Sequence, residues 1–373
     1  MSTGSALLVE CEVLPGLEEF LEQELARRFQ GRVSGMREGG SSARRFAFRG
    51  AVGDLLGLRT AHAAYLVLGF AGRRPTALLG HQNLQALVAG VALARKLHPP
   101  DAFRSFRLGA AGRDSSTFSR LAAELEWASG LPHDPEGGDL LLRFRPWASG
   151  GWEALVRLSP RPLATRAWRV RDLPGALNAT IAAAMVEMTR PVPGDRFANL
   201  ACGSGTLLVE RLLRGPAREA VGCDLDSTAL EATRANVDAA GLAGAVRLVE
   251  ADATASGLPP GAFDAICADL PYGNLVGSHG DNARLYPALL EEAGRLARPG
   301  AAFVAITHEL RLFEACLPPQ RGVWRLERRL QVLQGGTHPR IYLLRRQRGA
   351  YPVVSLAASR TSTGTEGPIV EER

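Results

Sequence analysis

The sequence of 373 residues has little of what marks secreted, metal-binding or membrane proteins. Its five cysteines are scattered, with no C-x-x-C pair and no histidine at a ligand spacing, so we expect neither disulfides nor a metal site. The longest apolar stretches, such as AAYLVLGFAG, are too short to span a bilayer. No basic segment followed by an apolar one opens the chain, which predicts no signal peptide. We therefore expect a soluble, cytoplasmic and monomeric protein without membrane contacts.

Lysine is nearly absent, and Lys96 is the only lysine among the 44 lysine and arginine residues. A general bias toward arginine explains why arginine replaces lysine, but it does not explain how the charges are distributed along the chain. Residues 1–172 and residues 321–373 each carry an excess of six positive charges, whereas residues 173–320 carry an excess of six negative charges. Basic ends around an acidic middle predict that the ends hold a polyanion, with nucleic acid as the first candidate. The middle is then expected to bind a different ligand.

The acidic middle alternates strand and helix patterns. The predicted strands are RFANLA (196–201), EAVGCDLD (219–226), AVRLVEAD (245–252), AFDAICADL (262–270) and AAFVAITHE (301–309). A helix is predicted over 227–241, with Ser227 as its N-cap and Gly241 as its stop. The segments 323–334 and 339–346 predict a terminal hairpin. Alternation of this kind implies a mostly parallel sheet with right-handed crossovers.

The turn after the first of these strands is rich in glycine. Ligands of parallel sheets bind at the carboxyl ends of the strands, and the turn NLACGSGT (199–206) lies at such an end. It lacks the lysine of a P-loop and the full G-x-G-x-x-G spacing of a dinucleotide site. Gly203 and Gly205 nevertheless let the backbone pass close to a ligand.

Acids follow the next strands of the same region. Asp224 and Asp226 end the second strand and are acceptors of the kind that a ribose diol needs. Asp252 ends the third strand, where it is placed to accept a hydrogen bond from an adenine amino group. Each acid alone is also explained as a solvated loop residue. At the ends of neighbouring strands, together, they predict a ligand that contains a nucleoside.

The fourth strand stops abruptly at DLPYGN (269–274). Pro271 removes a backbone donor and pushes Leu270 toward an extended conformation. The stiff turn therefore holds the carboxylate of Asp269 beside the aromatic ring of Tyr272, at the carboxyl end of a strand.

In this order, NLACGSGT, GCDLD, EADAT and ADLPYG resemble the motifs of class I S-adenosylmethionine-dependent methyltransferases. The last motif is similar to the (D/N)-P-P-Y signature of enzymes that methylate exocyclic amines of nucleobases. The resemblance implies that Asp269 and the Leu270 carbonyl accept hydrogen bonds from the amine, that Tyr272 stacks on the base, and that Pro271 stiffens the turn. It implies S-adenosylmethionine as the cofactor and no metal. The residues that it assigns to the cofactor are Asn199, Ala201, Gly203, Gly205, Thr206, Asp224, Leu225, Asp226, Asp252, Ala253 and Asp269.

Leu270 stands where the signature usually has proline. Because the acceptor is its backbone carbonyl, the change keeps the acceptor, and Leu270→Pro should be tolerated. A general base is not required, since the amine proton can leave to water or to Asp269. His279 and His308 follow the fourth and fifth strands and are candidates only for assisting that step.

The front half resembles two further domains. LLVECEVLPGLEEFLEQEL, and SFRLGAAGRDSSTFSRLAAELEWASGL with the strands after it, resemble the ferredoxin-like and THUMP domains of the family that methylates guanosine N2 in tRNA. LPGALNATIAAAMVEMTRP resembles the linker helix of that family. We therefore expect an α/β chain with two α+β domains before a Rossmann-like, seven-stranded methyltransferase sheet. The expected parts are a ferredoxin-like domain (1–72), a THUMP RNA-binding domain (73–171), a linker helix (172–190), the methyltransferase domain (191–350) and a disordered tail (351–373).

Arginines punctuate the predicted THUMP domain and its exit, where they can grip the phosphates of a folded RNA by shape. The arginines expected to contact RNA are Arg104, Arg107, Arg113, Arg120, Arg161, Arg166, Arg169 and Arg171.

The resemblance implies transfer of a methyl group from S-adenosylmethionine to N2 of a guanosine in tRNA, with position 6 of the acceptor stem as the preferred site. Position 10 of tRNA and large-subunit rRNA stay open as targets, and so does the choice between mono- and dimethylation. A non-catalytic RNA-binding module is a second interpretation, against which the acids at 224, 252 and 269 count. A protein or small-molecule methyltransferase is a third, because the turn also occurs in enzymes that methylate DNA and protein glutamine.

Overall fold

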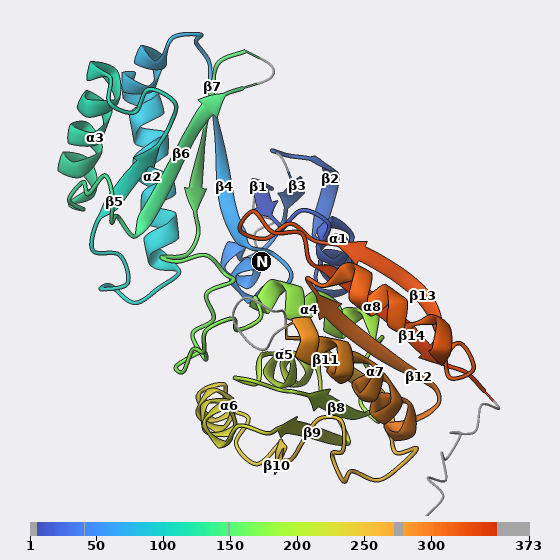
Figure 1. Ribbon diagram of the computed structural model, residues 1–373. Coiled ribbons are helices and arrows are strands. Elements are labelled where there is room, and N and C mark those ends of the chain that lie inside the picture. Colours follow the sequence, from blue (N-terminus) through green and yellow to red (C-terminus); the bar gives the residue numbers. More distant parts are fainter. Residues whose placement is uncertain (1–5, 41, 148–149, 272–278, 349–373) are drawn as a thin grey trace, which may run out of the picture.

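The structure is a computed structural model that describes residues 6–40, 42–147, 150–271 and 279–348. It consists of an N-terminal and a C-terminal unit, each built on a seven-stranded sheet, as Figure 1 shows. The expected α/β class and the seven strands of the second sheet are thereby confirmed. Within the described ranges, every helix is too short or too polar to cross a bilayer.

The first sheet has the strand order β2–β3–β1–β4–β7–β6–β5. Its strands are β1 (Leu7–Glu12), β2 (Val33–Glu38), β3 (Ala43–Phe48), β4 (Ala63–Phe70), β5 (Phe106–Gly109), β6 (Leu140–Pro146) and β7 (Trp152–Arg157). All neighbours are antiparallel except β5 and β6. Because β4 pairs with β7, the expected ferredoxin-like and THUMP domains share one sheet, and a boundary near residue 72 stays a prediction.

Three helices cover one face of this sheet, and they are α1 (Glu18–Arg28), α2 (His81–Lys96) and α3 (Ser116–Ser129). Alternation along β1 explains the arrangement, because successive side chains of a strand point to opposite faces. Val9 and Cys11 are buried in the core beneath the helices. Glu10, between them, points to the other face and forms an ion pair with Arg45. Two short 3-10 helices, η1 (Val52–Gly57) and η2 (Pro75–Leu79), precede β4 and α2.

The second sheet has the strand order β10–β9–β8–β11–β12–β14–β13. Its strands are β8 (Arg196–Leu200), β9 (Glu219–Asp224), β10 (Arg247–Glu250), β11 (Phe263–Asp269), β12 (Ala297–Thr307), β13 (Trp324–Gln331) and β14 (Arg340–Arg346). The first five strands of that order are parallel, while β14 runs antiparallel to β12 and to β13. The predicted parallel sheet and the terminal hairpin are both confirmed.

Helices cover both faces of the second sheet, as a parallel sheet requires. On one face lie α4 (Ala179–Met188), α5 (Thr206–Arg214) and α6 (Ser227–Ala239), and on the other lie α7 (His279–Leu296) and α8 (Leu310–Cys316), which η3 (Pro318–Gln320) follows. The predicted cap of α6 is wrong by one residue. Asp226 is extended and its side chain accepts from the Thr228 amide at 2.8 Å, so Asp226 and not Ser227 is the N-cap. The predicted stop at Gly241, with φ of 70°, is confirmed.

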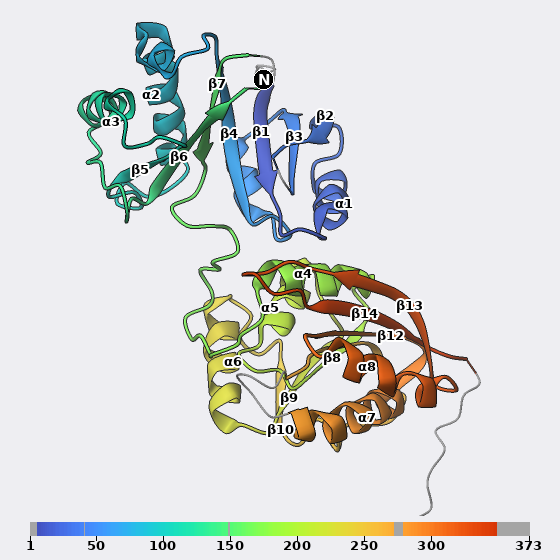
Figure 2. The ribbon, with the colours of Figure 1, turned by 45° about the horizontal axis from the view of Figure 1, so that its top comes forward.

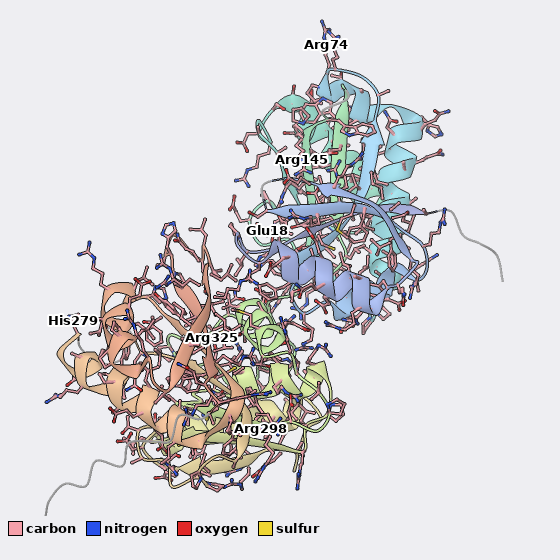
Figure 3. All side chains as sticks on the ribbon, turned by 90° about the vertical axis from the view of Figure 1, so that its right-hand side faces the viewer. Glu18, Arg74, Arg145, His279, Arg298 and Arg325 are labelled. Carbon is pink, nitrogen blue, oxygen red and sulfur yellow. The ribbon has the colours of Figure 1, made fainter. Side chains whose placement is uncertain are left out.

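The two units touch through α1 and α4. Leu17 and Phe20 are buried in the same core cluster as Ile181 and Met185. The hairpin between β13 and β14 adds a backbone bond, because the Leu333 amide donates to the Pro15 carbonyl at 3.1 Å. Figure 3 shows Glu18 of α1 on the side of the N-terminal unit that faces the C-terminal unit, with Arg74 at the far end. The chain crosses between the units in an irregular linker, residues 158–178 between β7 and α4, which Figure 2 shows at one side of the molecule.

Candidate functional site

A cavity of about 480 Å³ opens at the carboxyl ends of β8, β9 and β11. Parallel α/β sheets bind their ligands at this edge, and the volume is in the range of small-molecule sites. Residues 201–204 form its floor, Asp224 and Asp226 one side, and Asp269 another. Residues 173–177 of the linker close it from outside the sheet.

The charge of this cavity, which we call the large cavity, limits the kinds of ligand that it can bind. Among the described residues that line it, three are carboxylates, Asp224, Asp226 and Asp269, and none is lysine, arginine or histidine. Phosphate-containing cofactors need donors or positive charge, so this cavity disfavours them and favours a cationic or hydroxyl-rich ligand. Within the described ranges, His, Cys, Asp and Glu side chains form no group of three that suits a metal ion.

The glycine-rich turn between β8 and α5 is shaped for close approach. Ala201 and Gly203 have φ of 50° and 54°, a left-handed conformation that is costly for alanine and so marks a constrained backbone. The Gly203 amide donates to Asp224 at 2.8 Å, and its carbonyl accepts from the Thr233 hydroxyl at 2.7 Å. A Cβ atom added at Gly203 would meet no protein atom within 4 Å, because the residue faces the cavity. The turn thus leaves room for a ligand at its backbone.

Two side chains fasten the linker residues that close the cavity, one from the linker itself and one from α6. The Arg169 guanidinium donates to the Leu177 carbonyl at 2.6 Å and to the Thr206 hydroxyl at 2.9 Å, at the start of α5. The Asn236 amide donates to the carbonyls of Arg171 and Ser204 at 2.8 and 2.9 Å. These bonds tie the linker to the glycine-rich turn, so the wall of the cavity has a fixed position.

Asp269 stands at the junction of two cavities. It lines the large cavity and also a smaller one of about 140 Å³, together with Asn178, His308 and Gln334. Burial raises the pKa of its carboxyl from the ordinary 3.8 to about 7. One carboxylate that faces both spaces is suited to hold a group from one ligand against a group from another.

The turn after Asp269 is held against the end of β12. The Leu270 amide donates to the Ile306 carbonyl at 3.0 Å, and among the described residues none donates to the Leu270 carbonyl. The acceptor role expected of that carbonyl stays a prediction. Pro271 lines the large cavity, and its own carbonyl accepts from the Tyr286 hydroxyl at 2.6 Å. Tyr272, the predicted stacking residue, lies outside the described residues.

The two histidines named from the sequence occupy different places. His308 lines the small cavity beside Asp269, and burial lowers its pKa, which favours the neutral imidazole. The His279 side chain is 78% exposed and contacts Glu309. Of these two histidines, His308 is the one that lines a cavity together with Asp269.

The structure brings together some of the predicted cofactor residues and leaves others aside. Those that line the large cavity are Ala201, Gly203, Thr206, Asp224, Asp226 and Asp269. Those outside its lining are Asn199, Gly205, Leu225, Asp252 and Ala253. Asp252 is exposed and its carboxylate accepts from the amide and hydroxyl of Thr254. Sequence reasoning missed Cys202, Ser204 and the linker wall; only the resemblance of residues 172–190 to a linker pointed toward that wall.

The arginines assigned to RNA divide into exposed and internal side chains. Arg104, Arg161 and Arg171 are exposed, and so are Arg113, which pairs with Glu136, and Arg120, which pairs with Glu124 at 3.8 Å. Arg107 is half-buried. Arg166 is 7% exposed and pairs with Glu210, and Arg169 bonds to the linker and α5. The last two side chains thus fasten the linker instead of standing free for phosphates.

Comparisons with known proteins agree with this geometry. The family described as RMKL-like, methyltransferase domain, matches residues 166–340. The tRNA (guanine(6)-N2)-methyltransferase of Thermus thermophilus is 30% identical over 346 residues, which are 90% of this chain and 98% of that protein. The tRNA (guanine(10)-N2)-dimethyltransferase of Methanothermobacter thermautotrophicus is 33% identical over 141 residues, 37% of this chain and 41% of its own.

A solved structure extends the likeness to the whole fold. The crystal structure of TrmN from Thermus thermophilus superposes with a TM-score of 0.69 and 27% identity, over 91% of this chain and 99% of that one. The match to the Thermus enzyme thus includes both sheets and the linker, and this chain belongs to the tRNA (guanine-N2)-methyltransferase family.

Proposed function

We propose that this protein transfers a methyl group from S-adenosylmethionine to the exocyclic N2 amine of a guanosine in tRNA, at position 6 of the acceptor stem. The observation that carries the proposal is the position of Asp269, which lines the large cavity and the small one at once. The large cavity is assigned to the cofactor and the small one to the target base. The proposal places the enzyme in the cytoplasm, with its tRNA substrate.

The residues of the large cavity fit S-adenosylmethionine. Its three carboxylates suit a ligand that carries a sulfonium, an ammonium and a ribose diol, and the lack of basic residues in the described part of its lining would suit a phosphate poorly. Asp224 accepts two backbone amides, from Gly203 and Asp226, and its two oxygens keep lone pairs for ribose hydroxyls. Leu225 lies outside the cavity lining, but it follows that acid directly and is 70% exposed, so it offers an apolar surface for an adenine ring.

The chain contributes orientation and proton acceptance to the reaction. When bound, S-adenosylmethionine supplies an electrophilic methyl group on its sulfonium. An exocyclic amine of guanine is a weak nucleophile, because its lone pair is delocalised into the ring. Asp269 and the Leu270 carbonyl accept its two hydrogens and hold the nitrogen toward the large cavity. The proton released after transfer passes to Asp269, to His308 or to water, and the lowered pKa of His308 keeps its imidazole ready to accept it.

The small cavity carries polar groups suited to the rest of the base. With N2 at Asp269, a guanine presents N1–H and O6 beyond it, one donor and one acceptor. Gln334, in the turn between β13 and β14, has an amide that offers both partners. Adenine held by its own amine would present only N1 there, so the same amide would be half satisfied. The lining therefore supports guanine as the target base.

The exposed arginines are assigned to the RNA backbone. Arg104, Arg120, Arg161 and Arg171 lie on the N-terminal unit and the linker, outside the folded core. Contacts to phosphates release counterions, so tRNA affinity should fall steeply with salt. Position 6 is favoured over position 10 because the position-6 relative matches 90% of this chain, including the N-terminal unit, whereas the position-10 relative matches 37%.

Mass spectrometry of nucleosides tests the reaction and its position. Purified enzyme is incubated with S-adenosylmethionine and an unmodified tRNA transcript, and with transcripts that carry adenosine at position 6 or at position 10. We expect N2-methylguanosine that disappears only with the substitution at position 6. Asp269→Ala serves as the inactive control. Loss of the product with the substitution at position 10, and not with that at position 6, would overturn the proposed target.

A further inference from the structure

The carbonyl of Pro271, in the turn that follows β11, accepts a hydrogen bond from a side chain of α7. Tyr286 of α7 donates its hydroxyl to that carbonyl at 2.6 Å, and the same hydroxyl lies 2.9 Å from Oγ1 of Thr307, the last residue of β12. Both side chains are completely buried. We propose that the hydroxyl pair of Tyr286 and Thr307 positions the Asp269–Pro271 turn for methyl transfer, as a pair of positioning residues behind the reacting groups. This inference rests on the proposed function of that turn.

The hydroxyls of Thr307 and Tyr286 form one chain of hydrogen bonds that ends at the Pro271 carbonyl. The Glu309 amide donates to Thr307 Oγ1 at 3.0 Å, so Thr307 can donate onward to the Tyr286 hydroxyl, which donates to the Pro271 carbonyl. Each hydroxyl then accepts once and donates once. Chains of this kind strengthen their members in a buried, low-dielectric environment. Burial also raises the pKa of Tyr286 to about 12, so its phenol stays a donor at every physiological pH.

Hydrogen bonds to β12 hold the turn on both sides of the Leu270 carbonyl, the proposed acceptor. The Leu270 amide is held by the Ile306 carbonyl, and the Pro271 carbonyl is held through Tyr286 by Thr307. Consecutive residues of the turn are thus tied to consecutive residues of the strand. The Leu270 carbonyl lies between the two ties, so its direction is set by them. Methyl transfer is sensitive to such placement, because a shift of about 1 Å in a reacting group can cost roughly 100-fold in rate.

Packing alone does not require the hydroxyl of Tyr286. The ring packs edge-on against Phe313, with centroids 6.1 Å apart, and a phenylalanine would fill the same space. A buried hydroxyl is unfavourable unless it is hydrogen-bonded. The same stretch of chain also holds the start of α7, because the Glu309 carboxylate contacts His279 and Asn282. The end of β12 therefore anchors both the turn and the helix that carries Tyr286.

The test removes each hydroxyl with little change of shape. Tyr286→Phe and Thr307→Val remove the hydroxyls, whereas Thr307→Ser keeps the hydroxyl and removes only a methyl group. Tyr342→Phe is the matched control, because Tyr342 is also fully buried in the same unit and bonds Glu314 at 3.1 Å, away from the turn. Single-turnover methylation of tRNA, the dissociation constant of S-adenosylhomocysteine and the melting temperature are measured for every variant.

We expect Tyr286→Phe and Thr307→Val to slow single-turnover methylation by about 10- to 100-fold at saturating substrates. The dissociation constant of S-adenosylhomocysteine should stay within about twofold, as expected when only the reacting geometry changes. Thr307→Ser should recover most of the rate, and the double variant should be little slower than either single one, because the two hydroxyls act through one chain. Rates no lower than that of Tyr342→Phe would overturn the inference.

A second readout keeps this inference separate from the proposed function. Crystal structures of Tyr286→Phe and Tyr342→Phe show directly whether the turn moves. The inference expects a displaced Leu270 carbonyl in the first and an unchanged one in the second. An undisplaced carbonyl in Tyr286→Phe would overturn it even if tRNA proved not to be the substrate. Wild-type enzyme that leaves tRNA guanosine unmethylated would instead contradict the proposed function.

Discussion

The carboxylate of Asp224 accepts a hydrogen bond from the Gly203 amide at 2.8 Å, so the acid that ends β9 also holds the turn that follows β8. The same side chain lines the large cavity. One residue thus shapes the backbone of the site and is also the contact that we propose for the ribose of the cofactor.

Asp224→Ala should weaken cofactor binding much more than RNA binding. Loss of a charge-assisted contact to the ribose is worth roughly 2–3 kcal/mol, so the affinity for S-adenosylhomocysteine should fall about 30- to 150-fold. Titration calorimetry measures the dissociation constant. Glu250→Ala is the control, because this exposed acid ends the neighbouring strand β10 outside the cavity lining. Equal affinities for the two variants would remove Asp224 from the cofactor site.

Activity should depend on the ionisation of Asp269. Burial raises its pKa to about 7, and the ionised carboxylate is the stronger acceptor for the amine. We expect kcat/KM to increase with pH and to level off above about pH 7 in the wild-type enzyme. Asp269→Asn should be slower and should lose this rise, because its amide does not titrate. A wild-type profile that stays flat from pH 5 to pH 8 would contradict the assignment.

The same raised pKa should reduce stability at neutral pH. The unfolded carboxyl ionises near 3.8 and the folded one near 7, so folding is penalised increasingly as pH rises between these values and fully above them. Asp269→Asn should therefore melt higher than wild type by about 2 to 6 °C at pH 8, with a smaller difference at pH 5. Calorimetry at both values measures it. A difference in melting temperature between Asp269→Asn and wild type that becomes smaller as pH rises would contradict the raised pKa of Asp269.

For Leu270→Pro, the sequence and the structure predict different outcomes. The signature alone predicts tolerance, but the Leu270 amide donates to the Ile306 carbonyl at 3.0 Å. Proline removes this donor, which should cost about 1 kcal/mol or more and loosen the turn. We expect a lower melting temperature and slower methylation than in Leu270→Met, which keeps the amide and an apolar side chain. Wild-type values for Leu270→Pro would favour the sequence prediction.

Glu210 should be essential to the attachment of the two units. Its side chain is completely buried between Arg59 of the N-terminal unit, at 2.5 Å, and Arg166 of the linker, at 2.9 Å. Glu210→Ala leaves two positive charges without their buried partner, which should cost about 3–5 kcal/mol in thermal or denaturant unfolding. Glu19→Ala, which breaks a half-exposed pair with Arg328 between the same units, should cost less than about 1 kcal/mol. Similar costs for both would contradict a special role of Glu210.

The sequence by itself determined the second sheet and the acids at its edge. Alternating strand and helix patterns imply parallel strands, and the carboxyl ends of parallel strands meet at one edge of a sheet. The rule needs only the pattern of each strand, yet it places the ends of all the strands, so the sequence alone predicts that Asp224 and Asp269 lie at the same edge. It did not place Asp252, whose carboxylate turns to Thr254. A choice between a nearby turn and a distant ligand depends on side-chain geometry, which strand patterns do not encode.

Only the tertiary structure decided how the linker and the turn are held. Arg161 and Arg166 are alike in the sequence, yet one is exposed and the other is buried against Glu210, 44 positions away. The wall of the cavity depends on Asn236, which bonds Arg171 across 65 positions. Tyr286 reads as one more apolar position of a helix until its hydroxyl is seen at the Pro271 carbonyl. Such contacts join segments whose periodicities are independent, and only close packing of the folded chain brings them together.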